Sequence, residues 1–132
     1  MSRRPYKPVM SRIWYLQQPR YRNYMIREMS SVFIGLWTLN LLIGLGRLIQ
    51  GPETWSQWLA LQAHPMMILF SAVTLVLALY HSLTWFRAVP QVMRIQIGTS
   101  LVSARLITNA HIAAMVGFSV VVLIATLWEG MR

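Results

Sequence analysis

Three long runs of the chain carry no charged residue apart from Arg47, namely residues 29–49, 65–86 and 106–128. A helix that crosses the hydrocarbon core of a bilayer needs about 20 mostly apolar residues, and each run is long enough. The long stem of Arg47 can carry its guanidinium to the headgroups while the helix continues. Successive core helices of a water-soluble protein would each have a charged face, which these runs lack. The pattern therefore predicts an all-α integral membrane protein with three transmembrane helices.

Proline and glycine mark the ends of these predicted helices. Gly51 and Pro52 are expected to end the first helix, because this dipeptide does not easily continue one. Pro65 falls in the first turn of the second helix, where a missing N–H costs nothing, and Pro90 is expected to end that helix. The stretch 50–64 between the first two helices is then an outer loop.

Basic residues gather before the first apolar run. Seven of the 12 Lys and Arg residues lie there: Arg3, Arg4, Lys7, Arg12, Arg20, Arg22 and Arg27. The stretch 50–64 has none, whereas the connection 87–105 has three. Because cytoplasmic segments of membrane proteins carry the excess of Lys and Arg, we expect a cytoplasmic N-terminus and a periplasmic C-terminus in a bacterial inner membrane. The predicted organisation is a basic tail, 1–27, with a short interfacial helix around 13–16, followed by a membrane anchor domain, 28–132.

The composition agrees with a membrane protein and narrows its chemistry. The chain is 56% hydrophobic and 11% charged, whereas soluble domains carry about 25% charged residues. A net charge of +9 could indicate nucleic-acid binding, but a basic head before apolar segments is typical of an anionic membrane face. The chain has no cysteine, which excludes disulfides, thiolate metal sites and cysteine-held iron–sulfur clusters within it.

With this topology, Glu28, His81 and Trp85 all lie at the cytoplasmic ends of helices. His81 and Trp85 are four residues apart and share one helix face. A carboxylate and a histidine near an interface can exchange protons close to neutral pH. An indole ring with its N–H can orient a planar ligand that has carbonyl oxygens. The combination favours a quinone site, where a quinol must lose protons as its electrons leave.

Structural interpretations stay open for each of these residues. Glu28 can be a helix-terminal charge that the helix dipole stabilises. His81 can bond a backbone carbonyl, and Trp85 can belong to the aromatic belt at the membrane interface. His111 is most simply a packing residue, although His81 and His111 on different helices are also a candidate pair of haem ligands. A transport component would need charges at mid-membrane or broken helices, and the sequence has neither.

Small residues recur four apart within two of the apolar runs. The pairs are Ser31/Gly35, Ala110/Ala114 and Ala113/Gly117. Such spacing lets helix backbones approach closely. The close approach can occur among the three helices of this chain or against a second membrane chain, and the sequence leaves both open.

Several short stretches, in order and with their spacing, resemble one family. They are Arg4-Pro5-Tyr6 with Pro8, Tyr24-Met25-Ile26-Arg27-Glu28, Gly51-Pro52-Glu53 with Trp55, and His81 with Thr84-Trp85-Phe86 and Pro90. They resemble the fumarate reductase C subunits, which are small hydrophobic membrane anchors of bacterial menaquinol:fumarate reductases. The match covers about the first 90 residues, and beyond them it rests on hydrophobicity and length.

The resemblance implies a function in anaerobic respiration with fumarate as electron acceptor. It implies a heterotetramer in which a flavoprotein subunit with FAD, an iron–sulfur subunit and a second hydrophobic anchor accompany this chain. It further implies that Glu28, Arg27, His81 and Trp85 belong to a menaquinol-binding site, with Glu28 accepting a proton. No haem is expected. The chain would itself carry no fumarate chemistry, in line with its lack of cysteines and of a dinucleotide-binding fingerprint.

Overall fold

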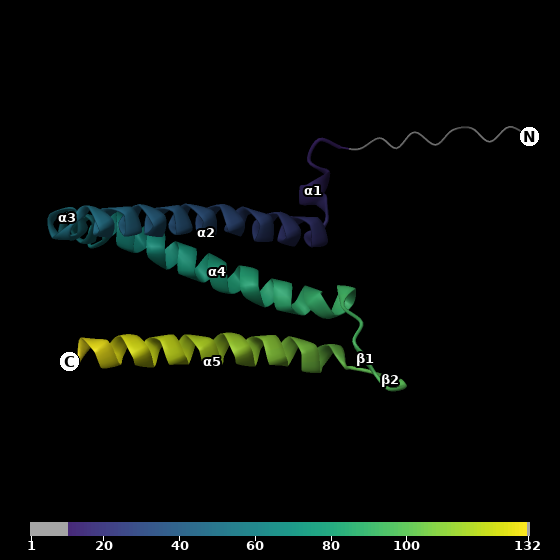
Figure 1. The fold of residues 1–132 in the computed structure, drawn as a ribbon. Helices are drawn as coiled ribbons and strands as arrows, with labels where there is room; N and C mark the ends of the chain where they lie inside the picture. The colour runs from purple at the N-terminus through teal and green to yellow at the C-terminus, as the bar shows by residue number, and fades with distance from the viewer. Residues whose placement is uncertain (1–10, 132) are drawn as a thin grey trace, which may run out of the picture. The chain divides into compact units, whose positions relative to one another are not determined.

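The computed structural model describes residues 11–131, and almost all of its ordered elements are helices (Figure 1). They are α1 (Trp14–Gln17), α2 (Pro19–Gln50), α3 (Pro52–Gln62), α4 (Pro65–Val92), β1 (Gln96–Ile97), β2 (Ser100–Leu101) and α5 (Ala104–Gly130). Among these, α2, α4 and α5 are long and apolar enough to cross a membrane. The prediction of an all-α chain with three spanning helices is confirmed. Residues 1–10, which hold part of the predicted basic tail, lie outside the described part.

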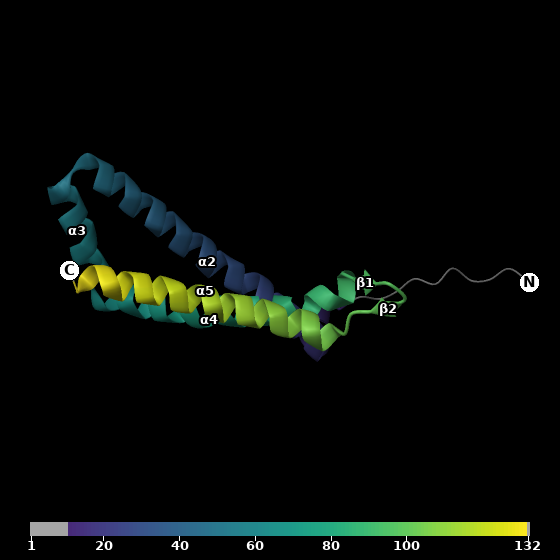
Figure 2. The ribbon, with the colours of Figure 1, turned by 60° about the horizontal axis from the view of Figure 1, so that its bottom comes forward.

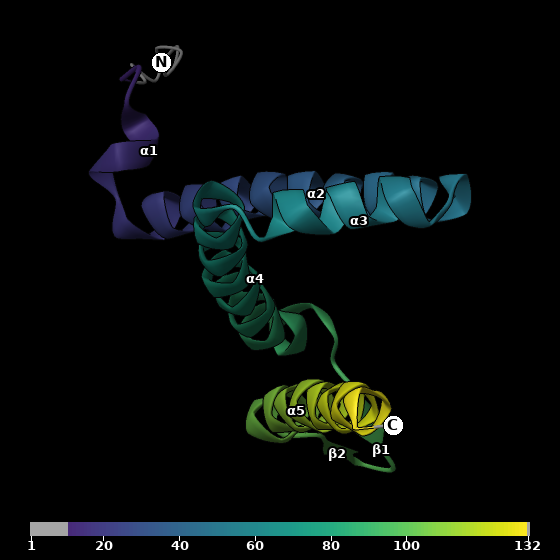
Figure 3. The ribbon, with the colours of Figure 1, turned by 90° about the vertical axis from the view of Figure 1, so that its left-hand side faces the viewer.

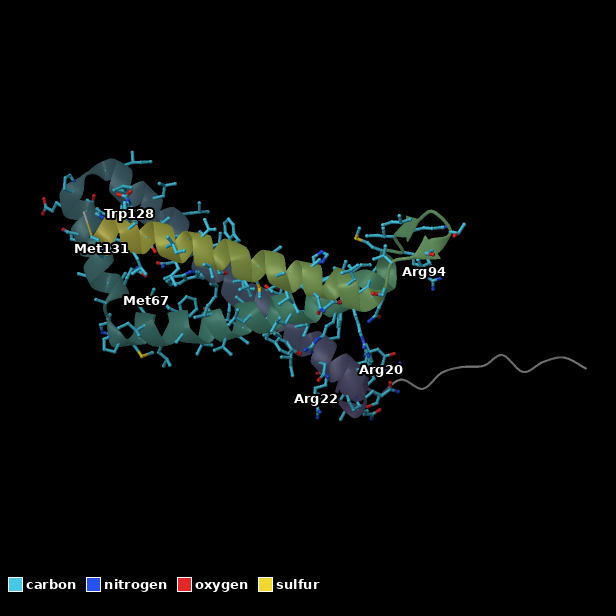
Figure 4. The ribbon with its side chains drawn as sticks, turned by 90° about the horizontal axis from the view of Figure 1, so that it is seen from below. Arg20, Arg22, Met67, Arg94, Trp128 and Met131 are labelled. Carbon is cyan, nitrogen blue, oxygen red and sulfur yellow. The ribbon has the colours of Figure 1, made fainter. Side chains whose placement is uncertain are left out.

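The chain divides into two compact units whose boundary falls inside α4, between Leu77 and Ala78. We call residues 11–77 the N-terminal unit and residues 78–131 the C-terminal unit. In each unit the labelled arginines lie at one end and the labelled apolar side chains at the other (Figure 4). Within the N-terminal unit these are Arg20 and Arg22 against Met67. Within the C-terminal unit they are Arg94 against Trp128 and Met131.

The N-terminal unit begins with α1, a single turn at the position predicted for a short interfacial helix. Gln18 is extended, and Pro19 starts α2 at a position where its missing N–H leaves no bond unmade. The ring of Trp14 meets Tyr21 edge-on at 4.8 Å, which holds the short helix near the first turns of α2. The first spanning helix therefore begins well before the apolar run does.

The stretch 50–64, predicted to be a loop, contains the helix α3, so that prediction is wrong. Gly51 ends α2 with φ of 123°, a conformation that favours glycine, and Pro52 then starts a new helix. The chain reverses at Gly51, and α3 runs back along the end of α2 (Figure 3). The helix was missed because its stability comes from packing on α2 more than from its own short sequence.

Three contacts join α3 to α2 in antiparallel register, and we call this element the α2–α3 hairpin. Nearest the turn, the Thr54 hydroxyl donates to the carbonyl of Arg47 at 2.8 Å. Next, the indole of Trp58 packs closely against Gly44, where an added Cβ would stand 2.6–2.9 Å from indole carbons. Farthest from the turn, the side-chain amides of Asn40 and Gln62 exchange hydrogen bonds at 2.9 and 3.4 Å.

The first half of α4 packs on α2 through aromatic rings. Phe70 lies 6.3 Å from Phe33 and 6.0 Å from Trp37, measured between ring centroids. The start of α4 is capped by His64, whose Nδ1 accepts the Met66 N–H at 3.3 Å. These contacts belong entirely to the N-terminal unit.

In the C-terminal unit, α4 continues through Pro90 to Val92, so the prediction that Pro90 ends the helix is wrong. A proline inside a helix leaves the carbonyl four residues earlier without its usual donor, here that of Phe86. The hydroxyl of Thr108 on α5 donates to this carbonyl at 3.2 Å. A neighbouring helix thus supplies the missing bond, which makes the proline tolerable within a membrane helix.

The connection between α4 and α5 is a small antiparallel hairpin, which the sequence did not reveal. Gln96 pairs with Leu101 and Ile97 with Ser100, and Gly98 takes φ of 60° in the turn. Figure 2 shows the hairpin extending beyond the adjoining ends of α4 and α5. Ser103 then caps α5 by accepting the Leu106 N–H at 3.3 Å.

The spanning helices bury very little of themselves within the chain. The most apolar windows of α2, α4 and α5 are 6%, 6% and 0% buried. A Cβ at Gly35 or Gly117 would meet nothing within 4 Å. In the described residues, the small-residue pairs at Ser31/Gly35 and Ala113/Gly117 therefore leave room for close approach by another chain.

Candidate functional site

Arg27 and Glu28 form an ion pair at the start of the apolar part of α2. The Nε of Arg27 lies 3.5 Å from a carboxylate oxygen of Glu28. The Arg27 side chain is 17% exposed, and its guanidinium stands 5.1 Å from the centre of the Tyr24 ring. The Glu28 side chain is 44% exposed. The arginine is therefore held on its own helix, while the carboxylate stays accessible to a ligand or a partner.

Two serines follow this pair and bind the helix backbone beside it. The hydroxyl of Ser30 donates to the carbonyl of Arg27, and that of Ser31 donates to the carbonyl of Glu28 at 2.5 Å. Ser30 is 1% exposed. Serine hydroxyls inside helices commonly donate a hydrogen bond to the carbonyl three or four residues earlier. Two polar side chains can therefore lie at the edge of a membrane segment.

His81 and Trp85 form the second predicted pair, on α4. Their ring centroids lie 6.4 Å apart with an interplanar angle of 49°, so they share one helix face as their spacing predicts. Between them in sequence, the hydroxyl of Thr84 donates to the carbonyls of Tyr80 and His81 at 2.8 and 2.9 Å. The structure thus brings His81 and Trp85 together in the C-terminal unit, and Arg27 and Glu28 together in the N-terminal unit.

The other two histidines have local structural contacts. The Nδ1 of His111 lies 2.7 Å from the carbonyl of Ile107, so this nitrogen carries the proton and donates it. The His111 ring also lies 5.4 Å from Phe86. These contacts favour the packing interpretation of His111. The capping role of His64 was missed, although a polar residue directly before Pro65 is a recognisable helix start.

An apolar groove lies beside the first turns of α2, with a volume of about 240 Å³. We call it the α1–α2 groove. Its walls are Tyr15, Leu16, Arg22, Met25, Ile26, Met29, Ser30, Phe33 and Leu77. Flexible methionine side chains adapt to irregular apolar ligands, so the groove can accommodate an acyl or isoprenoid chain.

A second hollow, of about 290 Å³, lies between the end of α4 and the start of α5. We call it the α4–α5 basic hollow. Its walls are Arg87, Pro90, Gln91, Ala104, Arg105, Thr108 and Asn109. Sequence reasoning used these arginines only as topology signals, because their meeting depends on how α5 returns against α4.

No group of three or more His, Asp or Glu side chains that could hold a metal ion occurs in residues 11–131. Many described polar side chains of the spanning helices bond a carbonyl of their own helix, whereas the buried hydroxyl of Thr74 in α4 has no hydrogen-bond partner within residues 11–131. Three exposed apolar helices, each long enough to cross a membrane, define a multi-pass membrane protein.

Comparison with known proteins identifies the family to which the chain belongs. The family model that describes the C subunit of fumarate reductase matches residues 1–127. The fumarate reductase C subunit of Vibrio cholerae is 42% identical over 123 residues, which cover 93% of this chain and 97% of that protein. The same subunit of Vibrio atlanticus is 40% identical over 92% of this chain and 96% of its own length, and that of Aliivibrio fischeri is 36% identical over 93% and 97%. The chain belongs to the family of fumarate reductase C subunits.

It is therefore a membrane subunit of fumarate reductase, part of a multi-subunit membrane complex, and a multi-pass protein of the bacterial inner membrane. The predicted resemblance is confirmed, and the match extends well beyond Pro90, where the sequence motifs ended.

Proposed function

We propose that this subunit anchors the flavoprotein and iron–sulfur subunits to the membrane and helps to form a menaquinol-binding site. A second hydrophobic anchor subunit would complete the site and the heterotetramer. The most apolar windows of α2, α4 and α5 are almost entirely exposed within this chain, which supports a membrane partner that covers part of their surface. The open small-residue positions Gly35 and Gly117 support close helix contact with that partner.

The observation that carries the quinol site is the accessible carboxylate of Glu28 beside the partly buried Arg27. Under the topology expected from the Lys and Arg distribution, the start of this spanning segment and the end of the second lie on the cytoplasmic side. Glu28 and the pair of His81 and Trp85 then occupy one membrane depth. This depth also suits electron transfer to an iron–sulfur subunit bound at the cytoplasmic face.

Each residue has a role that its chemistry supports. Menaquinol supplies two electrons and two protons when it is oxidised. Glu28 would accept a proton, and Arg27 would keep the carboxylate in place. The imidazole of His81 would bond a quinol oxygen, while the indole of Trp85 would orient the ring by contact and through its N–H.

The test is Glu28→Gln in the assembled complex. Glutamine keeps the size and hydrogen-bonding capacity of the side chain but cannot take up a proton. We expect menaquinol-driven fumarate reduction to fall by about 10²- to 10⁴-fold, the usual contribution of a positioned proton acceptor. Fumarate reduction driven by a dye that feeds electrons directly to the soluble subunits should stay unchanged. Normal menaquinol turnover in an intact complex would refute the role of Glu28.

We further propose that this anchor works without haem. In the C-terminal unit each candidate histidine packs on an aromatic side chain of the chain itself: the His81 ring lies 6.4 Å from that of Trp85, and the His111 ring lies 5.4 Å from that of Phe86. A reduced-minus-oxidised spectrum of the purified complex tests the proposal. A b-type band that disappears in a His81→Ala complex would contradict it.

A further inference from the structure

We propose that the α4–α5 basic hollow binds the phosphate of an anionic phospholipid. This site is separate from the quinol site, and the proposal does not depend on it. All of the residues that carry it belong to the C-terminal unit.

The hollow concentrates positive charge without a compensating acid. Arg87 comes from α4 and Arg105 from the first turn of α5, and both are exposed. Neither arginine has a carboxylate partner within residues 11–131. Guanidinium groups from two helices can bind one phosphate from two sides, and each offers paired donors to its oxygens. The N-terminus of α5, where the helix dipole is positive, lies at the same hollow.

The walls also hold uncharged donors and a fixed frame. Asn109 adds a side-chain amide to the hollow. Thr108 bonds the carbonyl of Phe86, and the Phe86 ring lies against His111, so α4 and α5 are fastened together directly beside the hollow. A site whose walls are already joined needs little rearrangement to bind a ligand.

The depth of the hollow identifies the ligand as a lipid. Arg87 directly follows the uncharged run that ends at Phe86, and Arg105 directly precedes the run that begins at Leu106. The hollow therefore lies at the level of the headgroups. Leu106 is 63% exposed, and most apolar side chains farther along α5 are exposed as well, so acyl chains can lie along the helix below a bound phosphate. Basic pockets between membrane helices at this depth are suited to anionic headgroups.

The experiment uses the detergent-solubilised complex, stripped of lipid and then exposed to defined lipids. Native mass spectrometry measures bound cardiolipin, phosphatidylglycerol and phosphatidylcholine on the intact complex. The test variant carries Arg87→Gln and Arg105→Gln together. The matched control carries Arg12→Gln and Arg20→Gln, which removes the same charge from the other end of the chain. A third variant carries Arg87→Lys and Arg105→Lys.

We expect the wild-type complex to retain the two anionic lipids in preference to phosphatidylcholine. The test variant should bind them about 25-fold more weakly, since each basic residue near an anionic surface contributes a factor of about five. The control variant should lose clearly less lipid than the test variant, because Arg12 and Arg20 do not line the hollow, and the lysine variant should recover part of the loss.

Three results would overturn the proposal. Equal lipid binding by the wild type and the test variant would exclude the hollow as the site. Complete displacement of the lipid by millimolar inorganic phosphate would make it a site for free phosphate. Loss of the soluble subunits from the test variant, with lipid binding unchanged, would make it a docking surface for an acidic protein segment.

Discussion

Gly44 offers a sharp test of the α2–α3 hairpin, because the chain contains its own control. An alanine Cβ at position 44 would stand 2.6–2.9 Å from three indole carbons of Trp58, closer than packed carbons can approach. At Gly46, on the same helix, an added Cβ would meet nothing within 4 Å. Gly44→Ala and Gly46→Ala therefore change the backbone equally and differ only in what the new methyl group meets.

The magnitude follows from two opposing effects. Replacing glycine by alanine inside a helix stabilises it by about 0.5–1 kcal/mol, and both variants gain this. Overpacking a close contact costs about 1–3 kcal/mol, and only Gly44→Ala incurs it. The hairpin contact in Gly44→Ala should therefore be about 1–3 kcal/mol weaker than in Gly46→Ala, or about 5- to 150-fold in its opening equilibrium.

Hydrogen exchange of the α3 amides in the purified complex measures that opening. We expect faster exchange throughout α3 in Gly44→Ala than in Gly46→Ala, because lifting Trp58 releases a helix that is too short to persist alone. Adding Trp58→Ala to both variants should remove the difference between them. Equal exchange rates in the two single variants would refute the claim that Trp58 packs on the backbone at Gly44.

Two further predictions concern α5 and the topology. Thr108→Val removes the donor to the Phe86 carbonyl and should destabilise the complex by about 0.6–1.7 kcal/mol in thermal unfolding. The control is Thr126→Val, because the Thr126 hydroxyl bonds a carbonyl of its own helix. This variant should lose less stability, and equal losses in the two variants would show that the bond to Phe86 contributes nothing. Since the chain has no cysteine, Arg12→Cys and Ser56→Cys provide unique thiols for labelling in intact cells with the outer membrane permeabilised. A membrane-impermeant thiol reagent should modify position 56 and spare position 12, and the reverse pattern would invert the proposed topology.

Both predicted site pairs could be recognised from the sequence because each lies within one helix. Arg27 and Glu28 are neighbours in the chain, and the four-residue spacing of His81 and Trp85 places them on one face of any α-helix. What the sequence could not supply was the packing of His111 on Phe86, since that contact requires α4 and α5 to lie side by side.

The three membrane-spanning helices were determined by the sequence itself. Their length and lack of charge are local properties, and a bilayer forces such a segment to satisfy its backbone bonds within a helix. The turn at Gly51 and the single-turn helix near residues 13–16 were readable for the same reason. The family could also be recognised from short motifs, because their order and spacing can be read without knowing how the helices pack.

Tertiary structure alone decided where those helices extend and what joins them. The helix α3 forms because Gly44 of α2 has no side chain and leaves room for Trp58, and because Asn40 of α2 bonds Gln62. Pro90 stays inside α4 because Thr108, distant in sequence, supplies a donor to the carbonyl that the proline leaves unpaired. These are contacts between residues far apart in the chain, so their energy is absent from any local pattern and appears only when the helices pack.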